Sequence, residues 1–310
     1  MRLCSWLIAL VAWPVMAGPI AYVPNEKSGT ISLIDTATDK VVAQIKAGVK
    51  PRGIAVSPDG RRLFVSDQPA NALLVIDLER RAVAQTIALG ESPEGVAISP
   101  DGKLVAAASE LANAVILVDT ASGAVVATIK TAGENPEHAV FSPNGKWIYV
   151  SAEDASQVDV IDVSLGKQTR VIPVKRRPRG IAFTPDGKLA YVACELDDTV
   201  FAIDARTHTV VAAIPAGKFS NGVVISPRGD KVYVSNGRGA SVSVIDVATN
   251  KVLSTIEVGQ RPWNMALTPD GSKLYVANGR SNSVSVIDTN GLRRLGDISV
   301  GEAPWGVVIY

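Results

Sequence analysis

Apolar residues recur at every second position in short segments of the chain, and turn-forming residues separate these segments. One stretch reads as four strands at residues 53–57, 63–66, 72–76 and 82–89. Alternation with period two over short segments is typical of β-strands, whereas an amphipathic helix would repeat its apolar positions every three to four residues. The pattern therefore predicts an all-β protein.

The first strand of each such unit is apolar on both faces. Its central triplet alternates bulky and small side chains, as in Ile54-Ala55-Val56 and Val96-Ala97-Ile98. A strand with one solvated face would alternate apolar with polar residues instead. These strands are therefore expected to lie in sheets that pack against neighbouring sheets on both sides.

The four-strand unit repeats along the chain. Its first turn, Ser57-Pro58-Asp59-Gly60, returns with small changes at residues 99, 142, 184, 226 and 268, in steps of 42 residues with one step of 43. Proline presets φ in such a turn and glycine accepts the left-handed conformation, so the motif predicts a hairpin between the first and second strands. A period near 42 with four strands is typical of β-propeller blades.

A second marker counts the units. An aspartate ends the apolar run of the third strand and is expected to open the next turn by accepting hydrogen bonds from nearby backbone N–H groups. Seven copies at equivalent places favour this structural role over a catalytic one. The aspartates are Asp35, Asp77, Asp119, Asp162, Asp204, Asp246 and Asp288.

The frame of the repeat predicts how a ring would close. Within a unit we label the strands a, b, c and d in chain order. The chain opens with a strand b at residues 20–23 and ends with a lone strand a at 306–310, which makes seven blades of four antiparallel strands. Pairing of that last strand with the first would remove two open sheet edges. The prediction is a single, monomeric, seven-bladed β-propeller domain at residues 18–310.

The first 17 residues have the features of an export signal. Arg2 supplies positive charge, residues 7–13 are apolar, and Val15-Met16-Ala17 offers small residues for cleavage after Ala17. The apolar run ends at Pro14, short of the ~20 residues that a membrane span needs. We expect a periplasmic or secreted protein with no membrane span. Cys194 would have no disulfide partner, because Cys4 leaves with the signal.

The charge balance argues against polyanionic partners. The formal net charge is +1 for the full chain, and loss of Arg2 with the signal brings it to zero. Bulk electrostatic attraction to nucleic acid or to an anionic membrane is therefore not expected.

Two segments carry a family signature. Tyr233-Val234-Ser235-Asn236 and Tyr275-Val276-Ala277-Asn278 are each followed, thirteen residues after the tyrosine, by the aspartate of Val-Ile-Asp. In these motifs the sequence resembles the YVTN-repeat β-propeller family, and the resemblance covers residues 20–310. The middle blades depart from the signature, with Ala106-Ala107-Ala108-Ser109 and Tyr191-Val192-Ala193-Cys194 in its place.

With seven repeats, a signal and almost no further sequence, the protein is most similar to the periplasmic propellers associated with PQQ-dependent alcohol catabolism and a linked transport system. That resemblance implies an accessory role beside quinoprotein oxidation. The quinoprotein dehydrogenases are also propellers, but they carry a tryptophan docking motif in most blades. Here only Trp263 and Trp305 lie one blade apart, so no quinone or other cofactor is expected.

Candidate binding residues lie where the repeats differ. The b-to-c and d-to-a loops share one face, and loops on a rigid scaffold commonly carry function. At the start of strand a the residue type changes from copy to copy. The next position is glycine in five copies, but His138 and Asn264 in the other two. The candidate rim residues are Arg52, Glu94, Glu137, His138, Arg179, Asn221, Trp263, Asn264 and Trp305.

The adjoining b-to-c loops are acidic in the middle blades and basic in the late ones, which predicts a rim with two poles. The loop before Glu137 also carries the extra residue of the 43-residue step. The acidic residues are Glu110, Glu153, Asp154, Glu195, Asp197 and Asp198, and the basic ones are Arg238 and Arg280.

Two rim features have a structural interpretation that we favour. His138 is expected to be a hydrogen-bonded structural histidine rather than a ligand or a base. Glu94 and Glu137 could hold Ca²⁺ with Asn135 or Asn221, because hard cations take oxygen ligands. Solvated carboxylates are the expectation, so no metal is assigned.

Two further features concern aromatic and basic side chains. Trp263 and Trp305, from neighbouring blades, could form an aromatic platform for a ligand or a partner, and neither this interpretation nor a structural one is favoured. Lys175-Arg176-Arg177 with Arg179 forms a basic cluster, which is expected to be a solvated loop.

The favoured function is non-enzymatic binding of a protein or small molecule on the b-to-c and d-to-a face, with no catalytic residues assigned. A lactonase-like hydrolase is the enzyme alternative, since some propellers carry a metal or His/Arg site at the channel mouth. It is weakened by the histidine count, because His208 falls in a c-to-d turn on the other face and only His138 remains. Single-stranded nucleic-acid binding would need an aromatic and basic groove, which low aromatic content disfavours.

Overall fold

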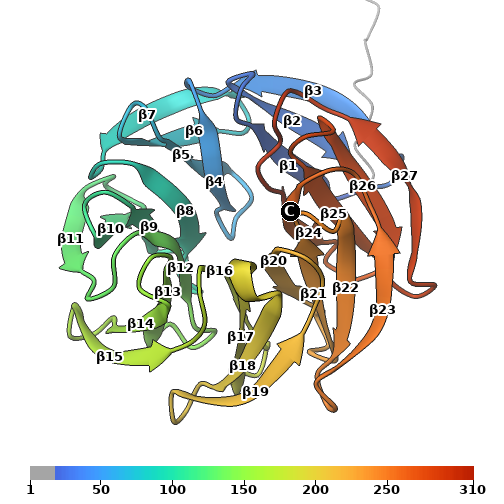
Figure 1. The fold of residues 1–310 in the computed structure, drawn as a ribbon. Helices are drawn as coiled ribbons and strands as arrows, with labels where there is room; N and C mark the ends of the chain where they lie inside the picture. The colour runs from blue at the N-terminus through green and yellow to red at the C-terminus, as the bar shows by residue number, and fades with distance from the viewer. Residues whose placement is uncertain (1–17) are drawn as a thin grey trace, which may run out of the picture.

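The computed structural model describes residues 18–310, which form 28 strands in seven four-stranded antiparallel sheets arranged in a ring (Figure 1). Each sheet follows chain order, apart from the sheet that joins the two ends of the chain. A short 3-10 turn, η1 (Glu195–Asp197), lies in one b-to-c loop. The predicted seven-bladed β-propeller is confirmed. The predicted export signal and its cleavage after Ala17 lie outside the described residues.

Strand a is the innermost strand of each blade and strand d the outermost. The a strands are β4 (Pro51–Val56), β8 (Pro93–Ile98), β12 (Pro136–Phe141), β16 (Pro178–Phe183), β20 (Ser220–Ile225), β24 (Pro262–Leu267) and β28 (Val308–Ile309). The b strands are β1 (Ile20–Asn25), β5 (Arg62–Asp67), β9 (Leu104–Ser109), β13 (Trp147–Ala152), β17 (Leu189–Cys194), β21 (Lys231–Asn236) and β25 (Lys273–Asn278).

The outer half of each blade consists of strands c and d. The c strands are β2 (Thr30–Asp35), β6 (Ala72–Asp77), β10 (Ala114–Asp119), β14 (Gln157–Asp162), β18 (Thr199–Asp204), β22 (Ser241–Asp246) and β26 (Ser283–Asp288). The d strands are β3 (Lys40–Lys46), β7 (Ala82–Ala88), β11 (Val125–Lys130), β15 (Lys167–Pro173), β19 (Thr209–Pro215), β23 (Lys251–Glu257) and β27 (Arg293–Ser299).

The ring closes as the repeat frame predicts. β28 pairs antiparallel with β1, with Ile309 opposite Ala21 and Val308 opposite Tyr22. The backbone N–H of Ile20 donates to the carbonyl of Tyr310 at 2.7 Å, and Tyr310 donates back at 3.1 Å. The last seven residues therefore complete the first blade.

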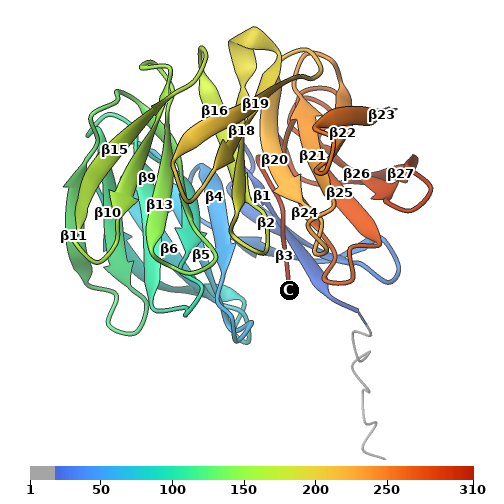
Figure 2. The ribbon, with the colours of Figure 1, turned by 90° about the horizontal axis from the view of Figure 1, so that it is seen from below.

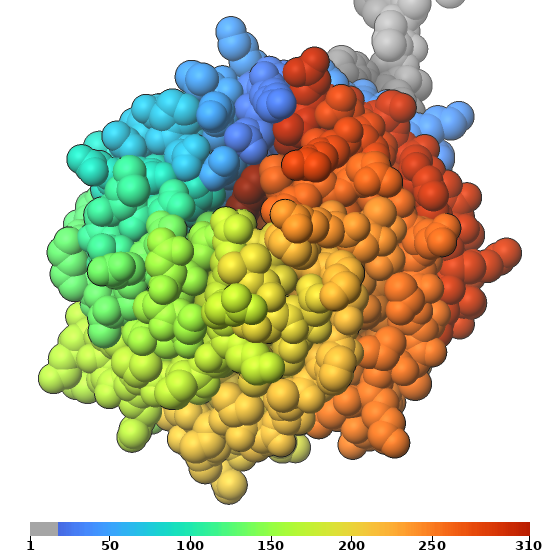
Figure 3. Space-filling model, viewed as in Figure 1, coloured from blue at the N-terminus to red at the C-terminus, as the bar shows by residue number. Residues whose placement is uncertain are grey.

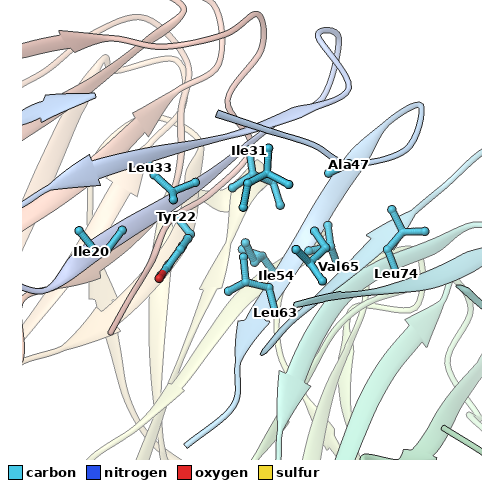
Figure 4. Close-up of a cluster of buried hydrophobic side chains, with 11 residues drawn as sticks. Ile20, Tyr22, Ile31, Leu33, Ala47, Ile54, Leu63, Val65 and Leu74 are labelled. Atoms are coloured by element: carbon cyan, nitrogen blue, oxygen red, sulfur yellow. The ribbon is translucent and has the colours of Figure 1, made fainter. Parts of the chain in front are cut away.

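The hydrophobic core lies between neighbouring blades. In the cluster of Figure 4, Ile31 and Leu33 on β2 of the first blade lie in one group with Ile54 on β4 and Leu63 on β5 of the second. Strands b and c of each blade are almost wholly buried and the a strands are buried or half-buried, while a d strand such as β7 is mostly exposed. This arrangement confirms that the a strands are packed on both sides.

The repeated turns have the contacts that their sequences predict. Ser57 donates to the carboxylate of Asp59 at 2.5 Å, and Gly60 has a φ of +66°. In the c-to-d turn, the carboxylate of Asp246 accepts a hydrogen bond from the N–H of Thr249 at 2.8 Å. Both turns are structural elements of the blade.

A tyrosine on strand b links adjacent blades at the same end of the molecule as these turns. Tyr149 is hydrogen-bonded to His208 of the next blade at 2.7 Å, and Tyr191 donates to Asn250 at 2.9 Å. His208 therefore lies in a c-to-d turn, as predicted, away from the b-to-c loops. In the side view the end of the molecule that carries these turns points down, and the C-terminus lies on that side (Figure 2).

Across residues 18–310, no helix has the length and apolar character needed to span a membrane.

Candidate functional site at the channel mouth

Each of the six full-length a strands begins with a β-bulge. In β4 the register shifts between Pro51 and Ile54, so that Arg52 and Gly53 lie opposite the single residue Ser66. The other five have a shift at the same place. A bulge redirects the side chain that it carries, and here it turns the second residue of strand a into the channel mouth. We call these second residues, together with Trp305 after Pro304 at the equivalent place in the closing blade, the entry positions.

The glycine after the entry position allows the inner strands to converge. A Cβ added to Gly53 would lie 2.2 Å from the carbonyl oxygen of Glu94 in the next blade, and one added to Gly180 would lie 2.6 Å from that of Asn221. No side chain fits at these distances. The close approach brings entry positions of adjacent blades together, which explains why glycine follows them in five copies.

Entry positions from all seven blades line one inner pocket of about 200 Å³. Three loop residues and Asn264 complete its wall. Its lining residues are Arg52, Glu94, Glu110, Glu137, Glu153, Arg177, Arg179, Asn221, Trp263, Asn264 and Trp305.

Ion pairs connect the charged side chains at the base of the inner pocket, which we call its floor. Arg179 lies 2.6 Å from Glu137, 3.2 Å from Glu195 and 3.4 Å from Glu153, and its side chain is 12 % exposed. Burial opposes the charged form of Arg179, but the three carboxylates outweigh it and raise its pKa. Arg179 is therefore a permanent cation at the centre of an acidic group.

Glu94 is the most strongly perturbed carboxyl group of the inner pocket. It is 1 % exposed and forms an ion pair with Arg52, and it accepts a hydrogen bond from Gln68 at 2.6 Å. Burial, and after it the charge of Glu137, raises the pKa of Glu94 to about 9. Burial also raises the pKa of Glu153. Both shifts favour the protonated, uncharged form of these two carboxyl groups.

An outer vestibule of about 690 Å³ opens beside this floor, where Figure 3 shows a hollow between the blue and the orange-red blades. Six cationic side chains and one carboxylate line it: Lys27, Arg52, Arg177, Arg238, Arg261 and Arg280, with Glu26. The two poles predicted for the rim are both present, with the carboxylates on the floor and the cations in the vestibule.

Two glycines keep the vestibule open. The residue directly after strand b is a glutamate in four blades, but it is Gly237 or Gly279 in the last two. A Cβ at Gly237 would lie 2.9 Å from Nη1 of Arg261, and one at Gly279 would lie 3.0 Å from the ring of Trp263. In these two blades glycine therefore replaces the carboxylate, and a larger side chain would collide with Arg261 or Trp263.

Aromatic faces hold two of the vestibule arginines. The guanidinium of Arg238 lies 3.8 Å from the ring centroid of Phe219, and that of Arg261 lies 5.9 Å from Trp263. Arg261 also forms an ion pair with Glu195 at 2.9 Å. Within residues 18–310, Lys27, Arg238 and Arg280 form no ion pair with a carboxylate, so their charge is available to a ligand.

Three floor residues have the chemistry of a metal site. One carboxylate oxygen from each of Glu110, Glu137 and Glu153 lies within 4.8 Å of the other two.

Comparisons with known proteins support the propeller fold. The family described as "Lactonase, 7-bladed beta-propeller" matches residues 165–305. The family described as "SMP-30/Gluconolactonase/LRE-like region" matches residues 15–154. Each match covers less than half of the chain. No curated protein matches the sequence.

Two solved structures show the same architecture. Hydrazine synthase of Kuenenia stuttgartiensis aligns with a TM-score of 0.79 and 24% identity, over 92% of this chain and 99% of that one. A functionally unknown protein from Desulfotomaculum acetoxidans aligns with a TM-score of 0.83 and 20% identity, over 94% and 98%. At these identities the similarity concerns the fold alone.

The structure corrects the prediction that the rim carboxylates are solvated. Glu94, Glu137, Glu153 and Glu195 are all buried, because the converging inner strands exclude water and arginines from neighbouring blades replace it. The calcium set suggested by the sequence is also only partly assembled. Asn221 lines the inner pocket, whereas Asn135 is directed toward Asp154.

Both ring nitrogens of His138 are buried, as expected of a structural histidine, and the ring lies beside the side chain of Asn264. The predicted hydrogen bond is not formed, because neither ring nitrogen has a partner of hydrogen-bond geometry among the described residues. The ring instead stacks on Trp305, with centroids 5.6 Å apart. Burial, followed by the charge of Arg179, lowers the pKa of His138 to about 3, so the imidazole is neutral at physiological pH.

The basic cluster is less solvated than expected, and the two tryptophans do not form one shared platform. Arg177 forms ion pairs with Glu153 and Glu195, and the Arg179 side chain is only 12 % exposed, so Lys175 and Arg176 alone keep the exposure expected of a solvated loop. Trp305 is buried against His138, while Trp263 lies under Arg261. The two indoles therefore have different neighbours and separate roles.

Sequence reasoning missed the loop contributions to the vestibule. Glu26 and Gln68 occupy the position of Glu110, and Arg261 and Phe219 occupy the position of Arg177, directly before strand a. The signal was present in the aligned repeats, since both positions change residue type between copies.

Proposed function

We propose that the protein binds a small organic anion in the vestibule of its channel mouth. The observation that carries the proposal is a group of six cationic side chains in a cavity of about 690 Å³; among the described residues, Arg52, Arg177 and Arg261 are paired with carboxylates and the other three are not. Volumes of roughly 300–1,000 Å³ are typical of small-molecule sites. Three of the cations, Lys27, Arg238 and Arg280, lack a carboxylate partner within the described residues.

Guanidinium groups suit carboxylate and phosphate ligands, because their parallel N–H donors match two oxygens of the anion. The face of Trp263 offers an apolar surface for the rest of the ligand. Partial exclusion of water strengthens such charge pairs relative to an open surface. The expected ligand is therefore a compact acid with one or two anionic groups and an apolar or sugar-like body.

The sequence resemblance supports a setting for this binding. Periplasmic YVTN-repeat propellers associated with PQQ-dependent alcohol catabolism suggest that the protein works outside the cytoplasm as a non-enzymatic accessory. Oxidation of an alcohol leads through an aldehyde to a carboxylic acid, which is an anion at neutral pH. A site for organic anions agrees with a role in capturing such a product for transport.

Lactone hydrolysis is the second candidate, favoured by the two family matches with lactonase descriptions. In that reaction water attacks the ester carbonyl, the ring C–O bond breaks and a hydroxy acid forms. A floor carboxylate would accept the proton of the water, and a neighbouring guanidinium would stabilise the developing oxyanion. Glu110 and Arg177 both line the inner pocket and have these chemistries.

The test starts with a thermal-shift screen of the mature protein against carboxylates, sugar acids and phosphates, followed by calorimetry of each compound that raises Tm. Arg280→Ala is expected to weaken binding about tenfold or more and to reduce its salt dependence. Arg61→Ala, an exposed arginine in the a-to-b turn of the second blade, is the matched control. Equal affinity in both variants would contradict the vestibule proposal.

The enzyme candidate is tested on the same preparation. A pH-stat assay with γ- and δ-lactones measures acid release directly. Hydrolysis well above the buffer rate that is lost in Glu110→Gln would favour lactone hydrolysis, while binding of the hydroxy acid without turnover would favour the accessory role.

A further inference from the structure

The floor of the inner pocket is rich in carboxyl groups. Its carboxyl groups and guanidiniums form one connected group, linked by ion pairs and by the shared pocket wall. The carboxyl groups are those of Glu26, Glu94, Glu110, Glu137, Glu153 and Glu195, and the guanidiniums are those of Arg52, Arg177, Arg179 and Arg261. Six acidic side chains therefore face four basic ones, an excess that favours a cation as the further partner.

The oxygens are spaced for a single ion. Carboxylate oxygens of Glu110, Glu137 and Glu153 lie within 4.8 Å of one another. Oxygen ligands lie at about 2.3–2.6 Å from Ca²⁺, so two of them on one ion can be up to about 5 Å apart. Among residues 18–310, the Glu110 carboxylate forms no ion pair and accepts one side-chain hydrogen bond, from the hydroxyl of Ser92 at 2.7 Å.

A fourth carboxylate shows that the group lacks a partner. The Glu94 side chain is only 1 % exposed, and its Oε2 has no hydrogen-bond partner among the described residues. Glu94 lines the same pocket as the three carboxylates. A buried carboxylate oxygen without a donor costs several kcal/mol in desolvation unless a cation or a proton compensates it.

We propose that Glu110, Glu137 and Glu153, with Glu94 beside them, form a binding site for one hard divalent cation of the Ca²⁺ type. Oxygen-only ligands favour Ca²⁺, Mg²⁺ or Mn²⁺ over softer metals. The pocket volume of about 200 Å³ leaves room for the ion and several of its waters.

The site does not depend on the organic anion of the vestibule, so the two proposals fail separately. Calorimetry on chelator-treated protein, titrated with CaCl₂ at pH 7.5, measures the cation alone. We expect one bound ion per chain and a rise in Tm of about 5 °C at a hundredfold excess over Kd. Mg²⁺ and Mn²⁺ titrations establish the ion preference.

Glu110→Gln is the decisive variant, because it removes one ligand charge without breaking an ion pair with an arginine. It is expected to weaken Ca²⁺ binding at least tenfold while the Tm of the metal-free protein stays the same or rises. Glu134→Gln, an exposed glutamate in the nearby d-to-a loop, is the matched control and should bind as the wild type does.

Two results would overturn the proposal. One is unchanged Ca²⁺ affinity in Glu110→Gln, which would place the ion elsewhere. The other is the absence of binding by Ca²⁺, Mg²⁺ and Mn²⁺, which would show that the carboxyl groups of the floor are compensated without a metal ion.

Discussion

Glu94 shows how burial changes a carboxyl group in this ring. Its folded pKa of about 9 lies far above the ~4.3 of an unfolded glutamate. The folded metal-free protein therefore keeps a proton that the unfolded chain has released, and its stability falls as the pH rises through this window. Between pH 7 and pH 9 the histidines no longer titrate, so the effect of Glu94 can be observed there.

We expect the free energy of unfolding of the metal-free protein to fall by about 1 to 2 kcal/mol from pH 7 to pH 9. Chemical denaturation in the presence of EDTA measures it. Glu94→Gln should flatten this part of the profile, and Glu134→Gln should keep the wild-type slope. An equal slope in all three proteins would show that Glu94 is already ionised at pH 7.

Substitution of the two tryptophans is expected to have opposite effects on stability and on ligand binding. Trp305 is 8 % exposed, stacks on His138 and donates its backbone N–H to Pro24 in the first blade. Trp305→Ala should destabilise the protein by about 3 kcal/mol or more, as for other buried aromatic residues. Trp263 is partly exposed in the vestibule, so Trp263→Ala should weaken ligand binding more than it lowers Tm. Denaturation midpoints and calorimetry of both variants check this, and a reversed order would show that the roles are exchanged.

At the scale of the element, the bulge and the turn shape each blade. The bulge at the start of strand a directs one side chain per blade into the channel mouth, and the turn after strand a returns the chain without contributing to the site. The bulge and the turn tolerate different residue types. Entry positions accept arginine, glutamate, asparagine or tryptophan, while the turn keeps glycine because its φ is positive.

Gly145 tests the turn without a steric clash. Its φ is +70°, and an added Cβ would meet only Pro100 at 3.8 Å. Gly145→Ala is therefore expected to cost about 1 to 2 kcal/mol, from the left-handed backbone alone. Gly296→Ala is the matched control, because that exposed strand glycine has nothing within 4 Å of an added Cβ and no positive φ. Urea denaturation compares the two, and an equal loss would contradict the backbone explanation.

At the scale of the whole molecule, stability depends on a closed ring. The final segment adds the pairing of β28 with β1, the hydrogen bonds between Tyr310 and Ile20, and the contact of Trp305 with Pro24. Of its three aliphatic residues, Val307 is buried while Val308 and Ile309 are half-buried. The backbone pairing and Trp305 therefore contribute a large share of the closure.

Deletion of residues 304–310 should expose β1 as an open edge, and we expect the shortened chain to aggregate or unfold. The lost pairing and burial are comparable with the ~5–15 kcal/mol net stability of a whole domain. Size-exclusion chromatography and thermal denaturation measure the outcome. A monomer with an unchanged Tm would refute the role of the closure.

A circular permutant provides the control for this deletion. A Pro-Asp linker between Tyr310 and Gly18 completes the a-to-b turn that the other blades have, and new ends can be opened between Ser122 and Gly123 in an exposed c-to-d turn. The permutant keeps every strand and should retain a Tm within a few degrees of the wild type.

The repeat alone determined the blade number, the strand order and the manner of closure, because each depends on local patterns that recur at a constant spacing. Ser57-Pro58-Asp59-Gly60 specifies its hairpin through the conformational preferences of its own residues. The identity of the entry positions followed in the same way, since a residue that varies within a constant frame is visible in the sequence.

Tertiary structure decided the chemistry of the site. The sequence suggested that Glu94 and Arg179 are solvated, but their burial and pairing depend on seven inner strands that converge, and strands from distant parts of the chain supply the partners. Glu195 meets Arg261 across 66 residues, a distance along the chain that no local pattern encodes. Charges that are separate in sequence acquire perturbed pKa values only when the ring brings them together and removes the water between them.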